Sequence, residues 1–125
     1  MVRLGIIALV VLVLVAGALT VRAQERPSAA SARDGRVTIT LRDFRFDPQT
    51  IRARRGRLTI VLRNEGRLGH GFRLLKNGRL WIKQPTLRPG ETVEITRRLE
   101  PGDYRMFDAL SNYEELGMYG TVAVR

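Results

Sequence analysis

The chain has 125 residues, with 22 Lys+Arg against 12 Asp+Glu, no cysteine and one histidine, His70. The lack of cysteine excludes a disulfide framework, a zinc ribbon, an iron–sulfur centre and a thiol nucleophile. A single histidine excludes an HExxH protease and an all-histidine metal cage within one chain. The length corresponds to one ordinary domain. The hydrophobic content of 44% is sufficient for a small packed core, so we do not expect a disordered chain.

The first 23 residues have the pattern of a secretory signal peptide. Arg3 supplies a positive start, residues 4–21 are uncharged and mostly aliphatic, and Val21-Arg22-Ala23 places small residues at a cleavage site. The uncharged run is also close to the shortest segment that spans a bilayer, so an uncleaved membrane anchor is the alternative. In both cases we expect the rest of the chain to be exported, either to the periplasm or to the outside of the cell.

Export restricts the partners that the net charge of +10 can attract. Nucleic acid is not an expected partner there, and a membrane is expected only through residues 1–23 if they stay attached. The expected partner is therefore an anionic surface or an unidentified exported protein. The arginines gather in residues 42–73, and the candidates for an anionic docking surface are Arg52, Arg54, Arg55 and Arg57. The alternative is that these side chains form the solvated face of strands.

In chain order, residues 24–35 are polar, small and aperiodic, which predicts a flexible linker before a domain at residues 36–125. The domain consists of short runs that alternate apolar and polar side chains, as half-buried strands do. These runs are 37–46, 51–53, 58–62, 72–74, 80–82, 93–99, 104–107 and 121–124. Turn residues separate the runs, and Asn77-Gly78 is the strongest hairpin signal among them. The pattern predicts an all-β sandwich of about seven to eight strands in two antiparallel sheets.

The turn motifs follow one another in a recognisable order. They are Phe44-Arg45-Phe46-Asp47-Pro48, Asn64 six residues before His70, Leu87-x-Pro89-Gly90-Glu91-Thr92, Pro101-Gly102-Asp103-Tyr104 and Gly117-Met118-x-Gly120. Together they resemble the cupredoxin (blue copper) family over residues 36–125. The resemblance implies a Greek-key β-sandwich in an exported protein, which in this family usually carries electrons through one copper ion.

The resemblance also assigns four positions to a copper site. His70 matches the first histidine, Asp108 the cysteine, Tyr113 the second histidine and Met118 the axial methionine. A blue, type 1 site needs two imidazoles and a thiolate with a weak axial thioether. Asp108 offers a hard oxygen instead, and a neutral tyrosine hydroxyl is a poor copper ligand. We therefore expect no type 1 copper centre on a retained scaffold, since a site and its fold are separable.

Each of the four residues also has a purely structural interpretation. His70 could be an imidazole bonded to a backbone carbonyl, and Asp108 could cap a turn or pair with Arg105. Tyr113 could pack against Met118, which would then be an ordinary core or loop side chain.

Three functions are compatible with these observations. The first is an exported binding or structural module without a functional copper centre. The second is a metal-binding protein whose altered nitrogen-and-oxygen site, from His70, Asp108 and Tyr113 or Glu114, suits colourless Cu(II) or Fe(III). The third is copper electron transfer, as the family resemblance suggests. No spacing supports a nucleophile–base pair, so the sequence does not indicate an enzyme.

Overall fold

The computed structural model of the protein describes residues 27–125. The signal peptide or anchor predicted for residues 1–23 lies outside these described residues. Within them, no helix has the length and apolar character needed to cross a membrane.

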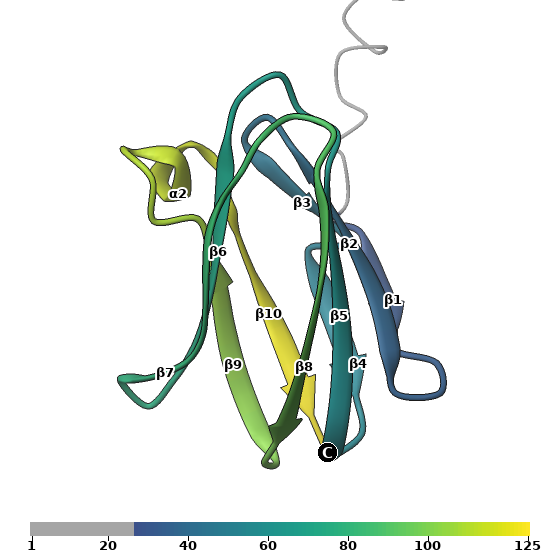
Figure 1. Ribbon diagram of the computed structural model, residues 1–125. Helices are drawn as coiled ribbons and strands as arrows, with labels where there is room; N and C mark the ends of the chain where they lie inside the picture. The colour runs from purple at the N-terminus through teal and green to yellow at the C-terminus, as the bar shows by residue number, and fades with distance from the viewer. Residues whose placement is uncertain (1–26) are drawn as a thin grey trace, which may run out of the picture.

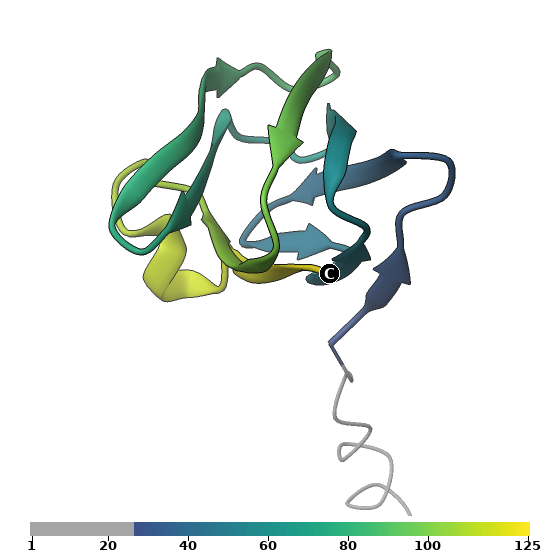
Figure 2. The same ribbon diagram turned by 90° about the horizontal axis from the view of Figure 1, so that it is seen from below.

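Ten strands form two sheets that pack face to face, as Figures 1 and 2 show from two directions. In order across the first sheet, the strands are β1 (Ala29–Ser31), β4 (Thr50–Ala53), β10 (Tyr119–Val124), β9 (Gly102–Phe107), β6 (His70–Lys76) and β7 (Arg79–Leu87). Across the second they are β3 (Arg45–Asp47), β2 (Arg36–Arg42), β5 (Gly56–Asn64) and β8 (Thr92–Leu99). A short helix, α2 (Tyr113–Leu116), precedes β10. The predicted all-β sandwich is confirmed, with more strands than the seven or eight expected. The expectation of two antiparallel sheets is wrong, because β4 pairs in parallel with β1 and β10, and β2 pairs in parallel with β5, so both sheets are mixed.

The core lies between the sheets and follows the alternation seen in the sequence. In β2, Val37, Ile39 and Leu41 are buried while the residues between them are exposed or half-buried. From the other sheet, Phe72 and Leu74 of β6 are fully buried. Burying such side chains contributes roughly 1.5–3 kcal/mol each, so the alternating pattern supplies the main drive to fold.

The predicted hairpin at Asn77-Gly78 is present between β6 and β7. Asn77 and Gly78 have φ of 49° and 74°. Two successive positive φ angles are typical of the type I′ turn, which matches the right-handed twist of paired strands.

The ordered sandwich begins before residue 36, within the segment expected to be a linker. Strand β1 pairs in parallel with β4, placing Ala30 opposite Ile51. The amide of Ala32 donates to the carbonyl of Arg52 at 2.8 Å. This pairing uses backbone groups and leaves all three β1 side chains exposed. The strand therefore has no hydrophobic pattern from which the sequence could predict it.

The loops gather at two opposite ends of the sandwich. The start of β6, the end of β9 and helix α2 lie at the upper end in Figure 1, whereas the C-terminus lies at the lower end. The turns joining β1 to β2 and β4 to β5 are also at the lower end. The predicted copper-ligand positions and the arginine candidates therefore belong to different ends.

Candidate functional site

At the upper end, the fully buried imidazole of His70 lies between two carboxylates. Its Nδ1 is 3.0 Å from Oδ2 of Asp108, and its Nε2 is 2.8 Å from Oδ1 of Asp43. His70 begins β6, Asp108 follows the end of β9, and Asp43 lies in the turn after β2. We call these three residues the His70 triad. It joins the two sheets across the upper end of the core.

Asp108 is fully buried and also closes a local turn. Its Oδ1 accepts a hydrogen bond from the amide of Leu110 at 3.0 Å. The interpretation that Asp108 pairs with Arg105 is wrong, because Arg105 forms its ion pair with Glu114. Both carboxylate oxygens of Asp108 are thus hydrogen-bonded, one to the His70 ring and one to the backbone amide of Leu110.

Asp43 is the member of the triad that the sequence analysis missed. Its carboxylate accepts hydrogen bonds from the amides of Arg67 and Leu68 in the loop that precedes β6. The hydrogen bond from His70, followed by the one from the Arg67 amide, lowers the pKa of the Asp43 carboxyl below its ordinary value of 3.8. Asp43 therefore ties the β2–β3 turn to this loop and to His70.

Asn64 fixes the loop that supplies these amides. Its fully buried side chain donates to the carbonyls of Leu68 and Leu87 and accepts from the amide of Gly66. A Cβ on Gly66 would lie 2.4 Å from Oδ1 of Asp43, so only glycine lets the loop approach this closely. Asn64, which precedes His70 in the sequence motif, thus anchors the loop that contacts the triad.

Tyr113 joins the site through its ring. The centroid of this ring lies 5.3 Å from that of His70 and 5.5 Å from that of Phe44, which it meets edge-on. Met118 is fully buried in the core, and its backbone accepts from the amide of Asp108 and donates to the carbonyl of Tyr113. The structure therefore brings His70, Asp108 and Tyr113 together and anchors Met118 beside them through the backbone.

The donor set does not fit a type 1 copper ion. The chain has no thiolate and one imidazole, where that ion needs two imidazoles and a thiolate. Both ring nitrogens of His70 already face carboxylate oxygens at hydrogen-bond distance. The two carboxylates bond to different nitrogens of the ring, and in residues 27–125 no three His, Asp or Glu side chains are grouped to hold a metal ion.

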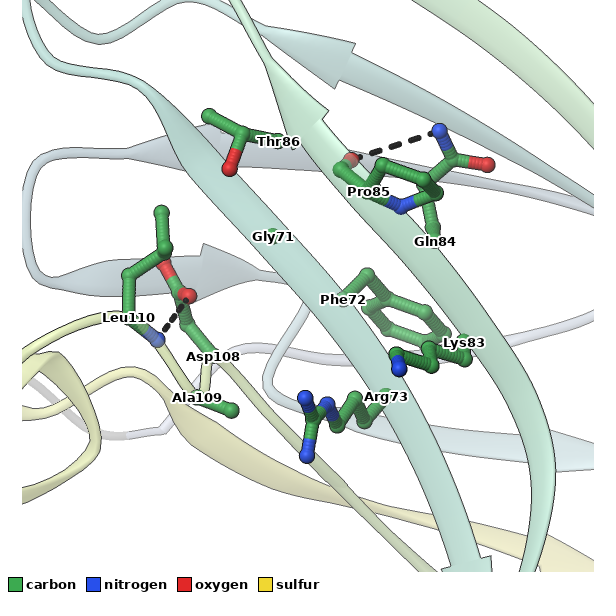
Figure 3. A pocket seen from close by; sticks show the side chains of 10 residues that line it. All are labelled: Gly71, Phe72, Arg73, Lys83, Gln84, Pro85, Thr86, Asp108, Ala109 and Leu110. Atoms are coloured by element: carbon green, nitrogen blue, oxygen red, sulfur yellow. Dashed lines mark hydrogen bonds between the residues drawn. The ribbon is translucent and has the colours of Figure 1, made fainter.

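A small hollow lies on the outer face of the sheet next to Asp108 (Figure 3). In Figure 3, Gly71 of β6 lies between Leu110 on one side and Pro85 on the other. Its volume of ≈120 Å³ is well below the roughly 300–1,000 Å³ of ordinary ligand pockets. The hollow therefore does not have the size of an ordinary ligand pocket.

The arginine candidates line two adjoining hollows at the lower end, and Arg54 borders both of them. Arg54, Arg55 and Arg57 line one hollow together with Arg33, which the sequence analysis did not select. Arg52 lies outside it, in an adjoining hollow with Arg125. Arg52 is inside β4, whereas the other three belong to the turn after β4 and to the start of β5.

The family model for the cupredoxin-like domain matches residues 5–124. The chain belongs to this family. Solved structures of blue copper proteins share the fold of this cupredoxin-like chain at low identity. Reduced auracyanin from Roseiflexus castenholzii is 16% identical with a TM-score of 0.69, over 75% of this chain and 99% of that one. No curated protein matches the chain.

Two further solved structures agree with this assignment. Auracyanin A from Chloroflexus aurantiacus, described as a blue copper protein, is 21% identical with a TM-score of 0.63, over 73% of this chain and 100% of that one. Reduced rusticyanin is 13% identical with a TM-score of 0.63, over 83% of this chain and 89% of that one. At such identities the likeness shows the fold alone.

Proposed function

We propose that this chain is an exported cupredoxin-like binding or structural module in which a hydrogen-bonded triad replaces the copper centre, and that it is not an enzyme. The single observation that carries the proposal is the direct contact of 3.0 Å between Nδ1 of His70 and Oδ2 of Asp108. These two residues match a histidine and the cysteine of the family's copper site. A hydrogen bond therefore joins two positions that a metal ion bridges in copper-binding relatives.

The triad performs the structural task that a metal would otherwise perform. It links the β2–β3 turn, the start of β6 and the end of β9 through side chains. Among residues 27–125 no buried side-chain nitrogen or oxygen lacks a hydrogen-bond partner. A metal ion that binds to His70 would have to displace one of these hydrogen bonds, which already satisfy both ring nitrogens in the absence of a metal.

Metal retention tests the proposal. The full chain in a nonionic detergent is equilibrated with Cu(II) or with Fe(III), dialysed, and measured for bound metal. We expect no stoichiometric retention of either ion. Retention of one copper with a fast, reversible voltammetric couple would establish electron transfer instead. Retention of copper or iron without such a couple would establish the altered metal site.

A restored ligand set provides the matched positive control. The double substitution Asp108→Cys and Tyr113→His supplies the thiolate and second imidazole that a type 1 site needs. We expect this variant to bind Cu(II) with intense visible absorption from thiolate-to-copper charge transfer. Tyr113→His alone keeps the Asp108 contact and stays colourless. This pair separates the effect of the missing donors from any effect of the fold.

A further inference from the structure

Four arginines surround an open hollow at the lower end of the sandwich, opposite the His70 triad. The hollow has a volume of ≈680 Å³ and lies between the turn before β2 and the turn before β5. We call it the arginine hollow. Its lining is Ala32, Arg33, Asp34, Gly35, Arg54, Arg55, Arg57 and Leu58.

The guanidinium groups of the arginine hollow have no counter-ion within residues 27–125. No ion pair or side-chain hydrogen bond there involves the four arginines, and Asp34 is the one carboxylate in the lining. Elsewhere the chain does pair its arginines, as in Arg36 with Glu94 and Arg105 with Glu114. The arginine hollow therefore holds a concentrated positive charge that the fold itself does not neutralise.

The strand register places a further pair of like charges next to the arginine hollow. Arg57 of β5 lies directly opposite Arg98 of β8. Like charges directly opposite on paired strands are destabilising. Arg98 also lines an adjoining hollow together with Arg55, so the positive charge continues across this end. Such an arrangement weakens the isolated domain and becomes favourable when an anion is bound.

Backbone hydrogen bonds hold both turns of the arginine hollow in place. Gly35 accepts from the amide of Thr59 at 2.8 Å, and the amide of Arg55 donates to the carbonyl of Arg125 at 2.8 Å. A ligand would therefore order only side chains and not the loops that carry them. This preorganisation lowers the entropic cost of binding.

We propose that the arginine hollow binds an acidic segment of a partner protein, whose Asp and Glu carboxylates pair with the guanidinium groups. Planar guanidinium forks match carboxylates in a bidentate manner. The inference rests on the proposed function, since it names the partner chemistry of that binding module. An anionic lipid surface fits less well, because interfacial binding also uses apolar side chains. None of the exposed large hydrophobic side chains of residues 27–125 lines the arginine hollow; they are Phe44, Leu68, Leu80, Leu116 and Tyr119.

The test uses a fluorescent octaglutamate peptide and the full chain in nonionic detergent, with anisotropy measured at low and physiological salt. We expect saturable binding that weakens as salt screens the charges. The triple substitution Arg54→Gln, Arg55→Gln and Arg57→Gln should weaken binding about tenfold or more, because it removes three of the four guanidinium groups that line the hollow. A control triple, Arg63→Gln, Arg67→Gln and Arg73→Gln, removes the same charge from other places and should change affinity less than about threefold.

Three outcomes would overturn the inference. The first is equal loss in both triple variants, which would show a diffuse field and not a site. The second is unchanged binding in the hollow variant while circular dichroism shows it folded. The third is full displacement of the peptide by micelles doped with phosphatidylglycerol, which would identify a lipid surface. Metal retention in the separate dialysis experiment would overturn the proposed function and leave the peptide result unaffected.

Discussion

At the triad's end of the sandwich, His70 is hydrogen-bonded to both Asp43 and Asp108, whereas the guanidinium groups of the arginine hollow at the opposite end have no ion-pair partner within residues 27–125. The triad is mostly buried and the arginines are exposed. A buried charge must be paired to persist, but an exposed one can stay free at small cost. The comparison indicates that the triad's end stabilises the domain and the hollow's end is available for contact.

The largest expected effect is the loss of His70. His70→Ala removes the side-chain partner of fully buried Asp108, and breaking a buried pair from one side costs about 3–5 kcal/mol. Chemical denaturation measures this loss of unfolding free energy. The control is Arg36→Ala, which breaks the exposed pair with Glu94 and should cost much less, because solvent and salt screen an exposed ion pair. Equal losses in the two variants would remove the distinction between buried and exposed pairs.

A smaller effect follows from neutralising Asp43. Asp43→Asn keeps the shape of the side chain but weakens its hydrogen bonds with His70 and with the Arg67 and Leu68 amides. Hydrogen bonds to charged groups contribute about 1.5–3 kcal/mol, so we expect a loss near the lower limit. Denaturation at neutral pH provides the measurement. A variant as stable as the parent would mean that the carboxylate charge contributes nothing to the triad.

In the parent chain, acid should remove the contribution of the Asp43 carboxylate to the free energy of unfolding. The pKa of Asp43 is lowered in the folded state, so its stabilisation is complete above the ordinary value of 3.8 and is lost as the pH falls through the lowered value. The stability difference between the parent and Asp43→Asn should therefore shrink below about pH 4. Denaturation curves recorded from neutral to strongly acidic pH show this. A difference that stays constant would contradict the lowered pKa.

The smallest expected effect is a gain at the arginine hollow. Arg57→Gln removes one of two like charges opposite each other and should stabilise the domain by about 0.2–0.5 kcal/mol. Arg63→Gln is the control, because Arg63 lies opposite uncharged Thr92. The gain in thermal midpoint should disappear at high salt, which screens exposed charges. Destabilisation by Arg57→Gln would show that this arginine has an internal structural role.

Much of the fold could be predicted from local patterns in the sequence. Alternation in residues 37–41 and the Asn77-Gly78 pair identify their strands and turn because both signals lie within a few residues. Strand β1 could not be found this way, since its Ala-Ala-Ser side chains are exposed and its pairing uses only the backbone of β4.

The site was predictable only in part. Spacing by family resemblance pointed to His70 and Asp108, which do lie side by side. Asp43 was missed because it is 27 residues from His70 and comes from the opposite sheet. A chemical argument could have indicated that a residue was missing. A buried imidazole needs a hydrogen-bond partner for each of its two nitrogens, and the sequence prediction supplied a partner for only one.

Strand β1 also decides how the domain can be shortened. It covers β4, which would otherwise be the edge of the six-stranded sheet, with its free backbone groups in solvent. Uncovered edges are templates for pairing with another chain. A chain trimmed to begin at Arg36 should therefore self-associate through β4, whereas one beginning at Pro27 keeps the short covering strand that blocks such growth.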